Sequence, residues 1–294
     1  MAAQVLVTPA RAPQCPAITA SCKDFDAIVF VHGIYGSAKT FRNDTTLFDW
    51  PSSMPVKINE RPIDVYTVAY DNALASWSKK DNPNFSEVAA QFLSALQPLR
   101  RREYRSIGFV AHSLGGNMVT TYLHLAKVRL GHARRAQHAY VITLATPVLG
   151  AHMADLASEF KAAIGMSDPL LKSLTANNLY LEMLQLFRIE EGKKSAENGC
   201  RPINLHAAYE RDRMGVARIV EPWSAKSSVE AIAASEVVGL SGDHSQVAKP
   251  ASPTDPVYEW TLGKVYSEFY RLEIWSQQAR SRGPRFHLCA DVAF

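Results

Sequence analysis

Residues 106–116 read Ser106-Ile107-Gly108-Phe109-Val110-Ala111-His112-Ser113-Leu114-Gly115-Gly116, and their pattern predicts the central element of the fold. The apolar run from Ile107 to Val110 is typical of a strand that is buried on both faces. Apolar residues at helical spacing follow the two glycines, namely Val119, Tyr122, Leu123 and Ala126. The stretch therefore predicts a strand, a sharp turn and a helix, with Ser113 in the turn.

Ser113 lies between two small residues, Ala111 two positions before it and Gly115 two positions after it. A turn this sharp strains the backbone of the serine, and bulky neighbours two residues away would collide there. The arrangement is the nucleophile elbow pattern, with Ala111 in place of the more usual glycine. The alternative interpretation is a serine in an ordinary glycine-containing turn.

The composition is that of a globular chain. The 294 residues fit one large α/β domain or two small ones, with 47% hydrophobic and 20% charged residues. The net charge of +4 is spread without a long basic run, and the short clusters Arg100-Arg101-Arg102 and Arg134-Arg135 are typical of a solvated surface. Nucleic-acid binding therefore has no support.

The four cysteines form neither CxxC pairs nor a zinc-ligand pattern; they are Cys15, Cys22, Cys200 and Cys289. We expect reduced thiols, although Cys15 and Cys22 are close enough to pair in an oxidising environment. The first residues contain no signal-peptide pattern, and no window approaches the ~18 apolar residues of a membrane span. These features predict a cytoplasmic protein, with export by a non-classical route left open.

Strands and helices alternate along the chain, after an N-terminal arm or edge segment over residues 1–23. The sequence predicts strands over residues 27–31, 64–70, 107–110, 139–147, 202–209 and 216–220, and helices over 87–99, 119–126 and 258–275. This order predicts an α/β fold with a mostly parallel sheet covered by helices on both faces. Residues 148–200 contain helical patterns and no convincing strand, so we expect a helical cap inserted into a single domain spanning 1–294.

A serine hydroxyl needs a base to accept its proton, and the base needs a third group to orient it. Among nine histidines, His244 is the favoured base because it lies in the glycine-containing loop 239–247, after the last predicted strand. The order serine, acid, histidine places the base there.

Three carboxylates compete for the role of the acid. Glu210 ends a predicted strand and is preferred, Asp212 is the alternative two residues later, and Glu221 follows the last predicted strand. Asp243 is too close to His244 in sequence to reach its Nδ1 atom easily. The other interpretation of Glu210 is a surface carboxylate paired with a neighbouring arginine.

Acyl transfer to the serine also needs N–H donors that stabilise the negatively charged oxygen of the tetrahedral intermediate. The backbone N–H of Leu114 follows the serine, and the turn after the first strand offers a second donor, for which we nominate Ile34. Gly33 lets this backbone approach a substrate closely.

Five segments together carry a resemblance to a known family: VHGIYGS, AHSLGG, LATPVLG, AAYE and GDHSQVAKP. From about residue 26 to about 250 the chain resembles the α/β-hydrolase lipases and esterases, and it looks closest to GPI inositol-deacylase-like proteins and their serine-active-site relatives. The resemblance implies an α/β-hydrolase fold with Ser113 as nucleophile, Glu210 as acid and His244 as base. It also implies oxyanion N–H groups on Ile34 and Leu114, and no metal or organic cofactor.

The function predicted on this basis is a serine hydrolase that cleaves carboxylic esters through an acyl-enzyme. The predicted cap is rich in apolar side chains: Met153, Leu156, Phe160, Leu170, Leu171, Leu174, Leu184, Leu186 and Phe187. If some of them face the site, the substrate carries an acyl chain, as a lipid ester does; the alternative is packing of the cap onto its own core. Peripheral membrane contact through the cap is left open. Two other hypotheses are an acyltransferase with the same triad and an inactive binding protein with this fold. The oligomeric state is not predicted.

Overall fold

The computed structural model describes residues 5–15, 21–33, 36–70, 85–135, 137–147, 203–212 and 237–282. The predicted cap over residues 148–200 and the predicted strand over 216–220 lie outside these ranges. Ile34, Glu221, Cys200 and Cys289 lie outside them as well.

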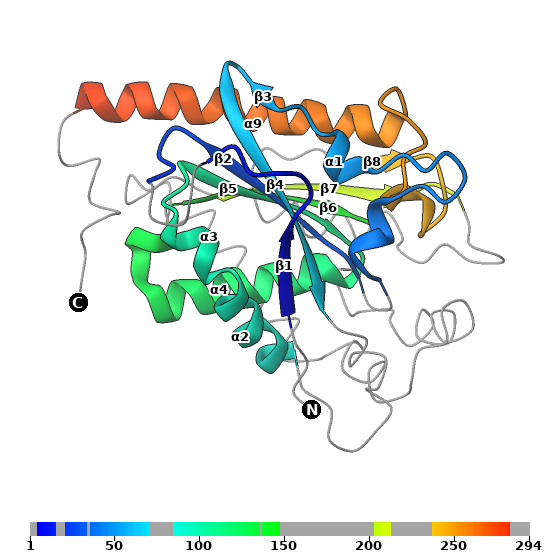
Figure 1. The fold of residues 1–294 in the computed structure, drawn as a ribbon, viewed down its shortest axis with the longest axis horizontal. Coiled ribbons are helices and arrows are strands. Elements are labelled where there is room, and N and C mark those ends of the chain that lie inside the picture. The colour runs from blue at the N-terminus through cyan, green and yellow to red at the C-terminus, as the bar shows by residue number, and fades with distance from the viewer. Residues whose placement is uncertain are drawn as a thin grey trace.

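The described residues build an eight-stranded sheet in the order β1-β4-β2-β5-β6-β7-β8, with β3 paired to β4 (Figure 1). The strands are β1 Val5–Pro9, β2 Asp26–Val31, β3 Lys57–Ile58, β4 Arg61–Tyr70, β5 Ser106–His112, β6 His138–Leu144, β7 Asn204–Glu210 and β8 Val237–Leu240. All neighbours from β4 to β8 pair in parallel, whereas β1 and β3 pair with β4 antiparallel. The predicted mostly parallel sheet is confirmed, and the N-terminal segment supplies its edge strand.

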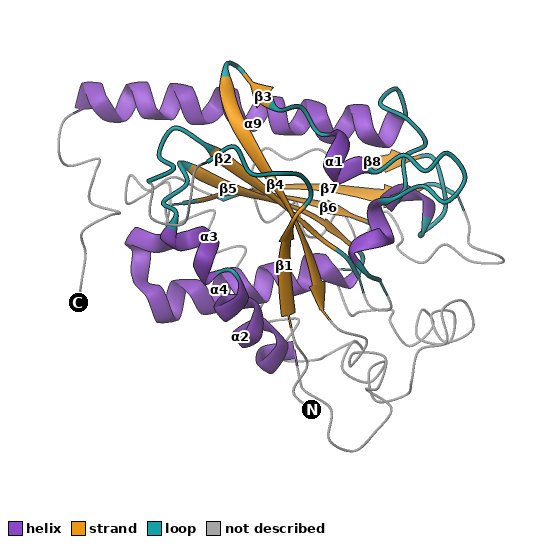
Figure 2. Ribbon diagram, in the orientation of Figure 1, coloured by secondary structure: helices purple, strands orange, loops and turns teal. Residues whose placement is uncertain are grey.

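Helices cover both faces of the sheet, as predicted (Figure 2). One face carries α2 Phe85–Ala95, α3 Gln97–Arg101 and α4 Leu114–Arg135, and the other carries α1 Trp50–Ser53 and α9 Pro256–Arg282. Short 3-10 helices occupy Ala38–Phe41 and Gln246–Ala248. No helix in these described ranges combines the length and the apolar character that a membrane crossing requires.

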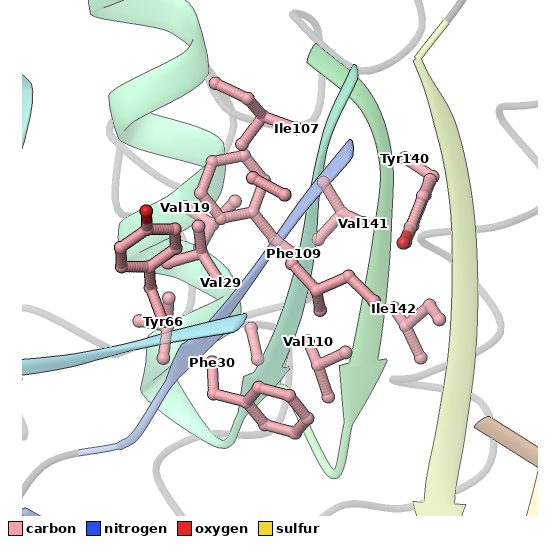
Figure 3. Packing of buried hydrophobic residues seen from close by; sticks show 14 of the residues in the cluster. Val29, Phe30, Tyr66, Ile107, Phe109, Val110, Val119, Tyr140, Val141 and Ile142 are labelled. Carbon is pink, nitrogen blue, oxygen red and sulfur yellow. The ribbon is translucent and has the colours of Figure 1, made fainter. Parts of the chain in front are cut away.

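The core lies in two layers, because alternate side chains of a strand point to opposite faces (Figure 3). Phe109 of β5 packs against Tyr122 of α4 with ring centroids 5.7 Å apart. On the other face, Phe30 of β2 packs against Trp50 of α1 at 5.4 Å. Burying each aromatic side chain contributes about 1.5–3 kcal/mol, so these layers hold β2 and β5, the two strands that lead into the predicted site.

Two predicted elements differ from the structure. The predicted helix over 87–99 is divided into α2 and α3, because Pro98 lacks the N–H that a continuous helix needs and is tolerated in the first turn of a new one. The predicted loop over 239–247 begins later, since its first two residues belong to the edge strand β8. Gly239 lies against the Tyr209 ring of β7, where a Cβ atom would come within 2.8 Å of the ring.

The expectation of reduced thiols is wrong for Cys15 and Cys22, which form a disulfide with their Cα atoms 5.9 Å apart. Spacing along the chain did not reveal that the arm folds back onto the sheet. The N–H groups of Gln14 and Cys15 donate to the carboxylate of Asp64 at 2.6 and 3.2 Å, and the N–H of Cys22 donates to the carbonyl of Arg102 at 2.7 Å. These bonds anchor the arm where the parallel strands begin.

Candidate active site

Ser113 is the single residue between β5 and α4, and its backbone is left-handed, with φ of 53°. Such a conformation costs of order 1–3 kcal/mol for a residue other than glycine. Two hydrogen bonds offset this strain: the Ser113 N–H donates to the Leu144 carbonyl at 2.8 Å, and the Thr146 hydroxyl donates to the Ser113 carbonyl at 2.8 Å. The turn is therefore held by β6, the strand next to β5.

Two glycines make room for this turn. A Cβ atom on Gly33 would lie 2.7 Å from the Cβ atom of Ser113, and one on Gly115 would lie 2.6 Å from the carbonyl oxygen of Val31. Both separations are shorter than any normal carbon contact. The start of α4 and the turn after β2 therefore approach each other only because both side chains are absent.

His244 lies beside the hydroxyl of Ser113. Its Nε2 atom is 2.9 Å from the Ser113 Oγ atom, and the two residues are 4% and 5% exposed. A neutral imidazole with its proton on Nδ1 accepts the serine O–H at Nε2, which is the geometry a general base requires. The structure thus brings together two residues that are 131 positions apart.

Glu210 lies on the other side of the same ring. It is the last residue of β7, it is fully buried, and its Oε1 atom is 3.5 Å from His244 Nδ1. The separation is within ion-pair range and slightly longer than an ordinary hydrogen bond. A buried carboxylate is retained only with a partner that balances its charge, so the interpretation of Glu210 as a surface carboxylate does not fit.

Asp212, the alternative acid, is placed differently. Its Oδ2 atom accepts the Gly242 N–H at 2.7 Å, and its own N–H donates to the Gly242 carbonyl at 3.2 Å. The N–H of Arg211 also donates to the Leu240 carbonyl at 2.8 Å. Asp212 therefore clamps the loop that carries His244, and Glu210 faces the imidazole.

The loop itself is shaped by Asp243. Its Oδ1 atom accepts the N–H groups of Ser245 and Gln246 at 2.9 and 3.0 Å, as in an Asx turn. Val247 and Ala248 are buried and fasten the far end of the loop. The backbone of His244 is thus held from both sides.

The predicted oxyanion donors have different outcomes. Leu114 is the first residue of α4, so its N–H lies at the positive end of the helix dipole and directly follows Ser113. Ile34 lies outside the described residues. The turn that leads to Ile34 is held by His32, whose Nδ1 lies 2.6 Å from the Gly33 carbonyl and whose Nε2 accepts the Tyr70 N–H at 3.4 Å. Burial lowers the pKa of His32 to about 4.

In the described part of the chain, no three His, Cys, Asp or Glu side chains are grouped to bind a metal ion.

Residues 23–198, more than half of the chain, match the family model described as "Putative serine esterase (DUF676)". The chain belongs to this serine esterase family. The matched range includes Gly33, Ser113 and Leu114 and ends before Glu210 and His244, which the fold brings beside Ser113.

Solved structures similar to this serine esterase are α/β-hydrolases. The mature lipase BlEst2 of Bacillus licheniformis is 15% identical over 87% of this chain and 97% of its own, with a TM-score of 0.54. The peroxisomal alpha-beta-hydrolase Lpx1 of Saccharomyces cerevisiae is 10% identical over 93% and 89%, and the RedJ thioesterase of Streptomyces coelicolor is 15% identical over 89% and 95%, each with a TM-score of 0.51.

The structural likeness over most of each chain shows the fold, and the predicted α/β-hydrolase class is confirmed. No curated protein matches the chain. The predicted likeness to GPI inositol-deacylase-like proteins stays a prediction. Membership of the serine esterase family indicates an ester hydrolase.

Proposed function

We propose that this serine esterase cleaves carboxylic esters through an acyl-enzyme on Ser113, with His244 as the base and Glu210 as the acid that orients it. The observation that carries the proposal is the buried line of three side chains, with Ser113 Oγ 2.9 Å from His244 Nε2 and Glu210 Oε1 3.5 Å from His244 Nδ1. A serine so placed loses its proton to the imidazole as it attacks a carbonyl carbon.

The reaction has two halves. His244 accepts the proton of Ser113 as Oγ bonds to the ester carbon, and Glu210 stabilises the imidazolium that results. The imidazolium then protonates the leaving alkoxide, which departs as an alcohol and leaves the acyl group on Ser113. In the second half a water molecule gives a proton to His244 as its oxygen bonds to the acyl carbon. The bond between that carbon and Ser113 Oγ then breaks, His244 returns the proton to Oγ, and the carboxylic acid leaves. The N–H groups of Leu114 and Ile34 stabilise the oxyanion in both halves.

The proposed substrate is a small-molecule or lipid ester with an acyl chain. Support comes from the apolar residues between positions 148 and 200 and from the lipase named among the similar structures. Contact of this segment with a lipid surface, and a cytoplasmic location, stay predictions. Hydrolysis rates for p-nitrophenyl esters of increasing chain length, with and without lipid vesicles, test the substrate class.

The central test compares two serines that lie close together in the fold. Ser113→Ala removes the nucleophile and should lower kcat for a p-nitrophenyl ester by about 10³-fold or more. Ser245→Ala, next to the proposed base, removes an exposed hydroxyl bonded to Asp243 and should leave kcat within about twofold of the wild type.

A fluorophosphonate probe should label the wild type and Ser245→Ala, and it should fail to label Ser113→Ala and His244→Ala. Full activity of a folded Ser113→Ala variant would contradict the proposal.

A further inference from the structure

His112 directly precedes the proposed nucleophile and contacts the proposed base. Its Nε2 atom is 2.7 Å from the carbonyl oxygen of His244, and the two rings lie with centroids 5.0 Å apart. Two consecutive residues of one strand end thus bind the same histidine, since His112 holds its backbone and Ser113 its side chain.

The protonation state of His112 follows from its surroundings. It is 7% exposed, and burial, with the nearby His244 as a smaller cause, lowers its pKa to about 3. The ring is therefore neutral near neutral pH and carries one N–H. A carbonyl oxygen only accepts hydrogen bonds, so that proton is on Nε2 and His112 is the donor.

The direction of this bond matters for the loop. The Asp212 clamp ties residue 242 to the end of β7, and the buried Val247 fastens the loop further along the chain. The bond from His112 ties residue 244 itself to β5, the strand that positions Ser113. The proton transfer depends on the distance from His244 Nε2 to Ser113 Oγ. A displacement of His244 by about 1 Å would therefore reduce the rate up to about 10²-fold.

We infer that His112 is a positioning residue whose Nε2–H holds the His244 backbone so that the imidazole meets the Ser113 hydroxyl. The inference rests on the proposed function of Ser113 and His244. It assigns to His112 a role that the sequence prediction missed, because adjacency to the serine placed it among residues of the turn and nothing in the sequence indicated a bond across 132 positions.

A matched pair of variants separates hydrogen bonding from space filling. In glutamine the Nε2 donor is the same number of bonds from Cβ as the Nε2 atom of histidine. Methionine has the same length and carries no donor. His112→Gln therefore keeps the bond to the His244 carbonyl, and His112→Met fills a similar volume without it.

We expect His112→Met to lower kcat for a p-nitrophenyl ester about tenfold. KM should change little, because substrate binding does not depend on the bond between His112 and the His244 carbonyl. His112→Gln should stay within about twofold of the wild type. Equal kcat values for the two variants, whether both high or both low, would overturn the inference, because the donor would then make no difference.

A second measurement does not depend on turnover. In crystal structures, the distance from His244 Nε2 to Ser113 Oγ should lengthen in His112→Met and stay near 2.9 Å in His112→Gln. An unchanged distance in His112→Met would overturn the inference even if no ester is cleaved. Failure of the proposed function is recognised separately, as absence of fluorophosphonate labelling of wild-type Ser113.

Discussion

Glu210 and Asp212 are two residues apart at the end of β7, and their carboxylates contact different partners. Glu210 is fully buried next to His244 Nδ1, whereas Asp212 is exposed and accepts the N–H of Gly242. In the proposed mechanism, the ionised carboxylate of Glu210 stabilises the imidazolium that forms when Ser113 gives its proton to His244. The carboxylate of Asp212 only holds the loop that carries His244. The amide variants of Glu210 and Asp212 should therefore differ widely in their loss of kcat.

Glu210→Gln should lower kcat by about 10³-fold, because the amide cannot balance the charge on His244. Asp212→Asn should lower kcat less than about tenfold, since the amide oxygen can still accept the Gly242 N–H. Steady-state kinetics of both purified variants measure the difference. A larger loss in Asp212→Asn than in Glu210→Gln would transfer the role of the acid to Asp212.

His32 and His112 make the stability of the fold depend on pH. The pKa of each lies below the ordinary value near 6.5, at about 4 for His32 and about 3 for His112, because burial disfavours the charged ring. As the pH falls below about 6.5, the unfolded chain binds protons that the folded chain does not. The free energy of unfolding therefore decreases by up to about 1.4 kcal/mol per pH unit for each histidine, until the pH reaches the folded pKa.

Urea unfolding between about pH 6.5 and pH 4.5 measures this effect. Burial opposes the shift, but the hydrogen bond with His206 and the charge of Arg271 lower the pKa of Glu268, and this contribution is the same in the wild type and in a His112 variant. As the pH falls, the free energy of unfolding of His112→Gln should decrease less steeply than that of the wild type. The difference in slope should correspond to about one bound proton. Equal slopes would show that His112 takes up its proton equally in both states.

The β5–turn–α4 element depends on one close contact between backbones. A Cβ atom at position 115 would come within 2.6 Å of the Val31 carbonyl, where neither group can move without separating α4 from β2. Gly263 of α9 offers the opposite case, because a Cβ atom there would meet nothing within 4 Å. The same substitution should therefore have opposite effects in the two helices.

Gly115→Ala should decrease the free energy of unfolding by about 1–3 kcal/mol and should also reduce kcat, because it displaces the Leu114 N–H. Gly263→Ala should increase the free energy of unfolding by about 0.5–1 kcal/mol, since alanine costs less conformational entropy in a helix. Chemical denaturation compares both with the wild type. A stabilised Gly115→Ala would mean that α4 does not start against β2 as described.

The elements also show what the sequence could predict. The strand, the serine turn and α4 were predictable because small residues and apolar spacing encode them within a few positions. The edge strand β8 was missed because four residues containing Gly239 carry too little pattern. The choice between Glu210 and Asp212 depends on the pairing of Glu210 with Leu240, a register that no local pattern encodes. Spacing alone therefore left both acids open.

Across the whole molecule, the disulfide and the candidate active site lie at opposite ends of the sheet. The Cys15 N–H donates to the carboxylate of Asp64, which pairs with Ala27 near the start of β2. At the other end, Ser113 follows β5, Glu210 is the last residue of β7 and His244 follows β8. A crosslink at the first end should support stability without touching the chemistry at the second.

Cys15→Ser with Cys22→Ser should decrease the free energy of unfolding by about 2 kcal/mol, because the unfolded arm regains freedom. The kcat for a p-nitrophenyl ester should stay within about twofold of the wild type. Thermal unfolding and steady-state kinetics on the same preparation measure both quantities. A loss of kcat without any loss of stability would show that the arm acts on the site.

The three proposed catalytic side chains come from two groups of strands that meet along one seam. Ser113 follows β5, Glu210 ends β7, His244 follows β8, and β6 lies between β5 and β7. Neither group contains a complete proton relay. During refolding from denaturant, esterase turnover should therefore not recover before β7 has docked against β6.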